Sequence, residues 1–143
     1  MKTILRPRPG DHPAFYTGYV DSAVGDDLLS ALKYASQAMR IVLGNLSPEK
    51  QDHRYAPGKW SVKEVVQHVA DCERIFAYRA LCIARGETKD LPGFDENAYA
   101  MEARTDLRSL ADILREQDAV RSATIELFQG LDSESISRKG MAN

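Results

Sequence analysis

An all-helical bundle is the fold class that the sequence predicts, and three observations support this prediction. Apolar residues recur at steps of three and four in three long stretches, which is the period of a helix with one buried face. No stretch shows the strict alternation of a half-buried strand. The 143 residues, 43% of them hydrophobic and 28% charged, suffice for one domain with a core.

The first long helix is expected from about Asp26 to Leu43, because leucines, Ala35 and Met39 recur along one face. Asp26 and Asp27 suit the positive N-terminal end of this helix, and Gly44-Asn45 is a plausible stop. Residues 1–25 hold three prolines and are expected to form an irregular arm with an aromatic patch. The patch comprises Phe15, Tyr16, Tyr19 and Val20.

The second helix has the clearest start signal in the chain. Ser61 and Glu64 have the spacing of a capping box, and Trp60 and Val65 have the spacing of a hydrophobic staple. The helix is expected to run to about Arg85. Its apolar stripe comprises Val65, Val69, Cys72, Ile75, Phe76, Ala80, Cys82 and Ile83, with His68 inside it.

The third long helix is expected from Thr105 or Asp106 to Gln129, ended by Gly130. Between the second and third helices, residues 86–97 are predicted to be a loop, whose Asp95-Glu96-Asn97 run is suited to capping the next helix. Residues 47–49 predict a short turn. The tail from residue 131 onward shows little periodicity.

Charge and composition exclude some partners. The net charge is −2, with 19 basic residues spread among 21 acidic ones, so a nucleic-acid partner is not expected. No apolar run has the length of a signal peptide or a membrane span. Cys72 and Cys82 would lie about 15 Å apart on one helix, too far for a disulfide. Reduced thiols are typical of the cytoplasm, which is the expected location.

His68 is the best candidate for chemistry, and two interpretations of it remain open. It is either a core histidine with one satisfied hydrogen bond or a metal ligand, since Glu64, Asp71 and Cys72 are its neighbours on the helix surface. Cys72 could also be a nucleophile beside His68, or simply a packed side chain. His12 and His53 are expected at the surface. One helix rarely supplies the three ligands of a catalytic metal site.

Three segments resemble the DinB-like superfamily, which includes the YfiT-type proteins. They are PGKWSVKEVVQHVADCE at residues 57–73, the stretch around LPGFDENAY at residues 91–99, and RKGMAN at residues 138–143. The resemblance implies an up-down-down-up four-helix bundle, often a homodimer. It also implies a divalent metal ion, nickel, zinc or iron, held by three histidines. The first of these histidines falls on His68.

The sequence departs from the family pattern at its far end. In the family, the other two histidines belong to an H-x-x-x-H pair on a fourth helix. The sequence ends at Asn143 and contains no such pair. We therefore expect that residues 26–143 form a bundle domain that is incomplete at its C-terminal end, with only three long helices encoded. Alternatively, a partner chain closes the bundle.

The resemblance favours a metal-dependent enzyme that acts on small molecules. Thiol S-transfer with a low-molecular-weight thiol and hydrolysis are the reactions that it implies. The alternatives are a non-catalytic helical module that dimerises, and a stress-response module that binds a small ligand.

Overall fold

The computed structural model describes residues 3–142, and within this range the regular structure is entirely helical. The only strand-like pairs in this range are two isolated bridges, Leu5 with Asp27 and Leu91 with Ala142. The chain forms two compact units, Met1–Gly44 and Asn45–Asn143. Over the same range, no helix has both the length and the apolar composition that a membrane span requires.

The first unit contains a short 3-10 turn η1 (Ala14–Tyr16), α1 (Thr17–Ser22) and the long helix α2 (Leu28–Leu43). Asp27 is the N-cap of α2, since its side chain accepts hydrogen bonds from the amides of Leu29 and Ser30. The α2 start therefore lies within two residues of the predicted one. The expected aromatic patch spans η1 and α1, and its three rings lie 5.1–6.4 Å apart between centroids.

Arg6 fixes the segment that follows α1. Its guanidinium donates hydrogen bonds to the carbonyls of Val20 and Ala23, both at 2.6 Å. Gly25 follows with a φ of 123°, in the region that favours glycine, and a Cβ there would lie 2.9 Å from the Ala31 amide nitrogen. The tight turn into α2 therefore depends on glycine at this position.

The second unit contains two long helices, α4 (Val62–Ala84) and α6 (Leu110–Gly130), together with three short helices and a 3-10 turn. The short elements are α3 (Pro48–Gln51), α5 (Glu96–Glu102), η2 (Thr105–Leu107) and α7 (Ser133–Ser137). With α2, the described chain thus has the three long helices that the sequence predicts.

The capping box of α4 is confirmed. The Ser61 hydroxyl accepts a hydrogen bond from the Glu64 amide at 3.2 Å, and the Glu64 carboxylate accepts one from the Ser61 amide at 2.6 Å. Arg54 holds the same carboxylate through a bidentate contact. The helix ends at Ala84, next to the predicted Arg85, and Gly86 follows with a φ of 88°.

The predicted start of the third helix is wrong. Thr105 and Asp106 belong to η2, and α6 begins only at Leu110, after the extended residue Arg108. Ser109 accepts a hydrogen bond from the Asp112 amide and so caps α6. The polar side chain of Ser109 competes for backbone donors that a continuous helix would need.

Helix α1 lies in the arm that was expected to be irregular, and two further short helices were not expected. Asp95 does cap the next helix, as predicted, but that helix is α5, because the Asp95 carboxylate accepts from the amides of Asn97 and Ala98 at 3.0 Å. Helix α7 lies in the tail that shows little periodicity. Both helices are shorter than two turns, so apolar periodicity cannot reveal them.

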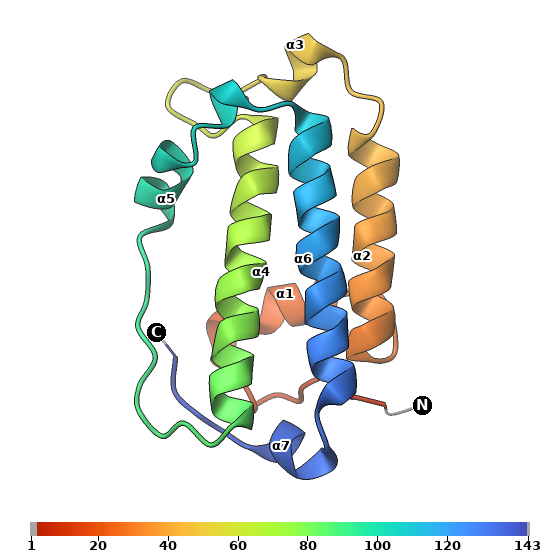
Figure 1. Ribbon diagram of the computed structural model, residues 1–143, viewed down its shortest axis with the longest axis vertical. Helices are drawn as coiled ribbons and strands as arrows, with labels where there is room; N and C mark the ends of the chain where they lie inside the picture. The colour runs from red at the N-terminus through yellow and green to blue at the C-terminus, as the bar shows by residue number, and fades with distance from the viewer. Residues whose placement is uncertain (1–2, 143) are drawn as a thin grey trace. The chain divides into compact units, whose positions relative to one another are not determined.

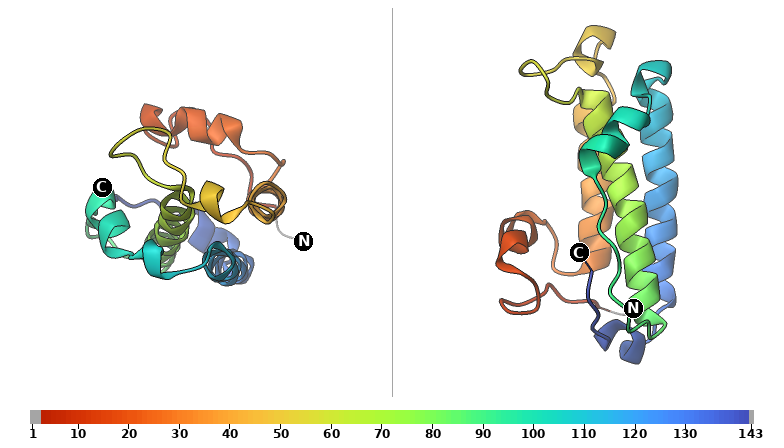
Figure 2. Two further views of the ribbon diagram at one scale, coloured as in Figure 1. Left: turned by 90° about the horizontal axis from the view of Figure 1, so that it is seen from above. Right: turned by 90° about the vertical axis from the view of Figure 1, so that its left-hand side faces the viewer.

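Helices α4 and α6 pack side by side and run in the same direction (Figure 1). Their contacts advance together along the two helices, from Gln67 with Glu116 to Glu73 with Arg121. Parallel neighbours need a long return connection, and residues 85–109 supply it by running back along α4 (Figure 2). The buried apolar side chains of this interface include Val66, Ala70, Ile113 and Val120.

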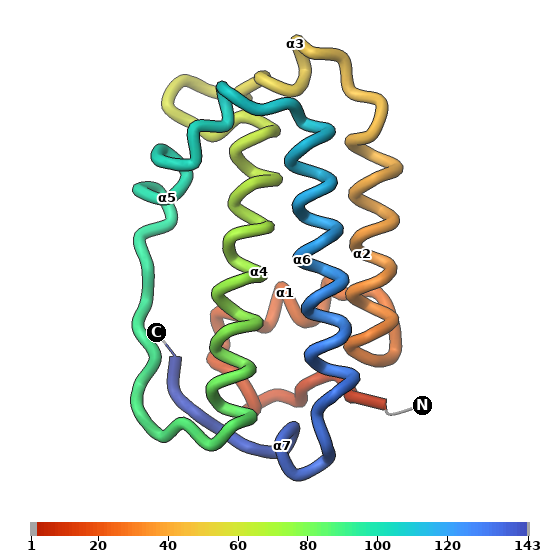
Figure 3. The backbone as a smooth tube through the Cα atoms, viewed as in Figure 1, coloured from red at the N-terminus to blue at the C-terminus, as the bar shows by residue number. Residues whose placement is uncertain are grey.

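The tail closes back on this connection. The Leu91 amide donates a hydrogen bond to the Met141 carbonyl at 3.0 Å, within the bridge that pairs Leu91 with Ala142. Arg138 donates to the Ala84 carbonyl at 2.7 Å and so satisfies a group at the C-terminal end of α4. The tail therefore runs alongside the segment that follows α4 (Figure 3).

Candidate metal-ligand site around His68

His68 lies on the second turn of α4 and is half-buried. The Trp60 ring packs on its imidazole, with 4.7 Å between ring centroids and 53° between ring planes. The Cys72 sulfur lies 3.3 Å from Nε2 and 3.6 Å from Nδ1. Because these two distances are similar, the sulfur contact does not single out either ring nitrogen. The sequence predicts the Cys72 contact from the i, i+4 spacing.

The Trp60 contact was not predicted. The capping pattern predicts that Trp60 packs on Val65 as a staple, but Val65 is 45% exposed and the indole lies on His68. Phe76, also placed in the apolar stripe by its periodicity, is exposed as well. The stripe that the sequence predicts is therefore only partly buried.

The Cys72 thiol is not activated in this environment. Burial raises its pKa first, the carboxylates of Glu96 and Asp71 raise it further, and Arg79 lowers it only in part. The thiolate is the nucleophilic form of cysteine, so the raised pKa argues against Cys72 as a free nucleophile at neutral pH. The packing interpretation of Cys72 is the better supported one.

The two carboxylates expected to support His68 are engaged with other groups. Glu64 is held by Arg54 and by the Ser61 amide, and these contacts outweigh burial and lower its pKa. Asp71 accepts a hydrogen bond from Gln67 at 3.1 Å. Over residues 3–142 no three His, Cys, Asp or Glu side chains converge to hold a metal ion. These residues therefore fit one or two ligand positions but not a complete three-ligand site.

The sequence predicts both of the other histidines at the surface, and only His53 is fully exposed. His53 is an exposed loop residue that follows α3. His12 is half-buried and belongs to the first unit, where its Nδ1 lies 3.0 Å from the neighbouring Pro13 carbonyl.

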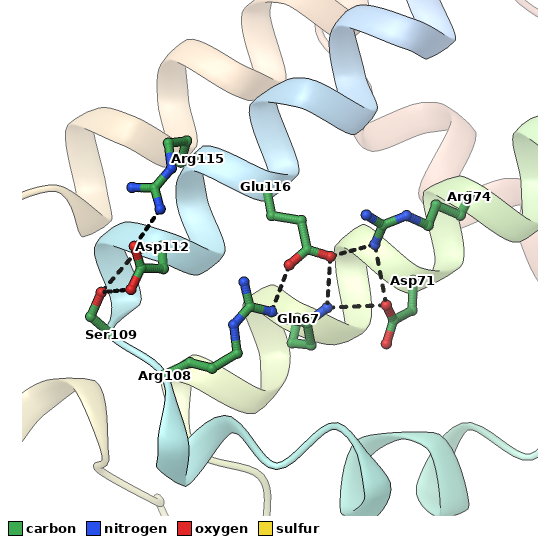
Figure 4. A network of polar contacts seen from close by, with 8 residues as sticks. All are labelled: Gln67, Asp71, Arg74, Arg108, Ser109, Asp112, Arg115 and Glu116. Atoms are coloured by element: carbon green, nitrogen blue, oxygen red, sulfur yellow. Dashed lines mark hydrogen bonds and ion pairs between the residues drawn. The ribbon is translucent and has the colours of Figure 1, made fainter.

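A polar network that includes Gln67, the residue before His68, lies between α4 and α6 (Figure 4). Arg108 donates to Gln67 at 2.7 Å and contacts Glu116 at 2.6 Å. Arg74 donates to the other Glu116 oxygen at 2.5 Å, so it is ion-paired. Burial raises the pKa of Glu116, but hydrogen bonds from Arg74 and Arg108 outweigh it and leave the pKa below its ordinary value.

A second polar cluster lies deeper in the same interface. Arg121 donates to both oxygens of Glu73, at 2.7 and 2.8 Å, and Gln117 donates to Glu73 at 2.7 Å. The side chains of Glu73 and Arg121 are only 10% and 11% exposed. Burial raises the Glu73 pKa, but the contacts with Arg121 outweigh it, so the pKa is lowered overall.

Neither cluster was predicted from the sequence. The pattern places Gln67, Asp71 and Arg74 on one face of α4, but it contains no signal for their partners more than 40 residues away. The sequence offers one indication of these clusters. One face of α4 carries an amide and two charged groups, at steps of four and three residues.

Two curated relatives carry names that describe a chemistry. A "Putative metal-dependent hydrolase" of Bacillus licheniformis is 34% identical over 79 residues, which are 55% of this chain and 44% of that protein. Another of the same name, from Oceanobacillus iheyensis, is 26% identical over 65 residues, which are 46% of this chain and 38% of that protein. The matches thus span less than half the length of either relative.

A solved structure shares the fold. YfiT from Bacillus subtilis, described as a probable metal-dependent hydrolase with an unusual four-helix bundle topology, superposes with a TM-score of 0.66 at 18% identity. The superposition covers 78% of this chain and 64% of YfiT. The all-helical fold class predicted from the sequence is therefore confirmed as that of a DinB-type helical bundle.

The family assignment rests on most of the chain. The model of the DinB superfamily matches residues 31–143, a range that includes α4, the connection through α5, α6 and the tail. This range includes all three segments on which the resemblance was based. The chain belongs to the DinB superfamily.

Proposed function

We propose that this protein is a metal-dependent enzyme that acts on small molecules, and that His68 is one of its metal ligands. The observation that carries the proposal is the position of His68. Its imidazole is half-buried on α4 between Trp60 and the Cys72 sulfur, where packing fixes the ring. The names of the two bacterial relatives and of YfiT support a metal-dependent chemistry.

The same names favour hydrolysis as the reaction class, and thiol S-transfer with a low-molecular-weight thiol is the finer alternative. Both reactions need a nucleophile at neutral pH, and divalent metals such as nickel, zinc or iron provide one by lowering the pKa of water or a thiol. A site with three protein ligands would need donors from outside residues 3–142, in addition to His68. We therefore assign His68 a ligand position and no step of a reaction.

A non-catalytic helical module that forms a homodimer is the second candidate. The observation that favours it is the same incomplete set of donors within residues 3–142. In this case His68 is a core histidine whose role is to pack against Trp60, and its replacement would affect stability alone.

Metal content distinguishes the two candidates. The full-length polypeptide, expressed without a histidine tag, should contain about one divalent ion per chain by elemental analysis. His68→Ala should remove most of this metal, because a ligand is lost, while the helical circular dichroism signal persists. The same measurement identifies the metal.

His53→Ala is the matched control, since His53 is an exposed loop histidine. It should leave the metal content unchanged. A folded wild-type protein without metal, or equal metal content in wild type and His68→Ala, would refute the assignment of His68 and support the dimer module.

A further inference from the structure

A hollow of about 460 Å³ opens between α4, α5 and the segment that joins α5 to α6. Gln67 and Asp71 line it from α4, Tyr99 and Glu102 line it from α5, and Arg108 lines it from the joining segment, together with two alanines. His68 is not part of the lining. The hollow is open to solvent, and its lining carries both negative and positive side chains.

The two charged groups at the inner wall retain free bonding capacity toward a ligand. Asp71 uses Oδ1 for Gln67, at 3.1 Å, and for Arg74, at 3.7 Å, while Oδ2 has no donor within residues 3–142. Arg108 uses Nη1 alone, for Gln67 and Glu116. Its Nε and Nη2 groups have no acceptor in that same part of the chain. Figure 4 shows the free Asp71 oxygen on the side on which α5 lies.

One buried amide holds both charged groups in place. Gln67 is only 5% exposed, and it donates to Asp71 through Nε2 and accepts from Arg108 through Oε1. Because both groups bond to the same amide, they lie within reach of one small ligand. The side chains of Asp71 and Arg108 are 25% and 32% exposed, so both are partly desolvated before a ligand arrives. Preorganised, partly desolvated groups bind a ligand at a lower entropic cost.

The rim adds a second carboxylate and an apolar surface. Glu102 is exposed and forms no ion pair within the described residues. Tyr99 is half-exposed, and its ring packs on Phe94 with 5.2 Å between centroids. A purely anionic ligand would meet two carboxylates here, and a purely cationic ligand would meet the guanidinium of Arg108. The lining is complementary to a molecule that carries both charges.

We propose that this hollow binds a small zwitterion, an amino acid or a molecule with an amino-acid end. The ligand's carboxylate would accept hydrogen bonds from Nε and Nη2 of Arg108, a geometry that guanidinium groups favour. Its ammonium group would donate to Asp71 Oδ2 beside Glu102, and its body would lie against Tyr99. This site requires no metal at His68, so it can be tested independently of the proposed function.

Three probes with one common skeleton test the proposal. Phenylalanine carries both charged groups, 3-phenylpropanoate lacks the amine, and 2-phenylethylamine lacks the carboxylate. Amide NMR titration of the full chain should show saturable shifts near residues 67–71 and 98–108. Phenylalanine should bind about five-fold or more tightly than either analogue, because each analogue leaves one charged group of the site unpaired. Alanine, propanoate and ethylamine repeat the comparison with a smaller body.

Variants assign each charge to its residue. Asp71→Asn should abolish the preference for phenylalanine over 3-phenylpropanoate, and Arg108→Gln should abolish the preference over 2-phenylethylamine. Glu126→Gln removes an exposed carboxylate of α6 outside the hollow and should change neither preference.

Arg108 also holds Glu116, so Arg108→Gln could disrupt the polar network between α4 and α6. Glu102→Gln is therefore the decisive variant, because Glu102 is exposed and lies outside that network. Glu102→Gln should weaken the binding of phenylalanine about two-fold or more and leave the binding of 3-phenylpropanoate unchanged. Equal binding of the three probes, no saturable binding in either probe set, or an equal effect of Glu126→Gln and Asp71→Asn would overturn the proposal.

Discussion

Arg121→Ala is expected to lower the free energy of unfolding by about 3–5 kcal/mol, the cost of breaking a buried ion pair from one side. The replacement removes the guanidinium partner of the Glu73 carboxylate, which is only 10% exposed in the pair, while the Gln117 amide still donates to it. An uncompensated buried charge is far more costly than a lost surface contact. Urea unfolding, followed by circular dichroism at pH 7, measures the change.

Arg115→Ala is the matched control for this prediction. Arg115 lies on the same helix and pairs with Asp112 at 2.5 Å, but its side chain is 74% exposed. Exposed pairs contribute about 0–1 kcal/mol, so the control should change stability little. If the two variants lost similar stability, the Glu73–Arg121 pair would not be the buried contact between α4 and α6 that we describe.

Ile113→Ala should cost about 2–5 kcal/mol, because it removes a large side chain from a fully buried position on α6. Ile113 is 0% exposed and belongs to the α4–α6 interface with Val66 and Ala70. Thermal or urea unfolding measures the loss. Ile113→Val, which removes one methylene, should cost about 0.5–1.5 kcal/mol.

The control for Ile113 is Leu107→Ala. Leu107 is 72% exposed in the turn that precedes α6, so its truncation should change stability by no more than about 0.5 kcal/mol. A small effect of Ile113→Ala together with a large effect of Leu107→Ala would mean that the apolar face of α6 is turned differently from the structure described here.

The sequence predicts the fold better where a local chemical signal marks an element. Both ends of α4 are predicted, because Ser61 and Glu64 form a capping box and Gly86 ends the helix. The start of α6 is not, because Leu107 and Leu110 keep helical spacing across a break that the backbone of Arg108 introduces. Helix α5 has seven residues, too few for a periodic pattern.

The candidate site is predicted only along one helix. The contact of His68 with Cys72 follows from their spacing on α4, and the inward position of His68 follows from the apolar stripe. The ring of Trp60 against His68 and the partners of Gln67 on α6 depend on tertiary packing, which no local pattern contains. Whether His68 binds a metal stays a prediction.

The carboxylates between α4 and α6 make this interface sensitive to acid. Glu73 and Glu116 have pKa values held below their ordinary range by arginines, so the folded protein binds fewer protons than the unfolded chain in mildly acidic solution. Their contribution is complete above the ordinary glutamate pKa and is lost as the pH falls through the lowered folded values. The urea midpoint should therefore fall between pH 7 and pH 3.5.

Arg121→Ala should reverse the contribution of Glu73 to the pH dependence of stability. Without Arg121, burial dominates at Glu73 and raises its pKa, so protonation relieves the unpaired charge. The stability gap between wild type and Arg121→Ala should narrow as the pH falls, and a gap that is constant with pH would contradict a charged Glu73 in the folded protein. If the gap narrows as expected, the parallel pair of helices is a proton-linked contact, in which hydrogen ions compete with arginine for the same carboxylate.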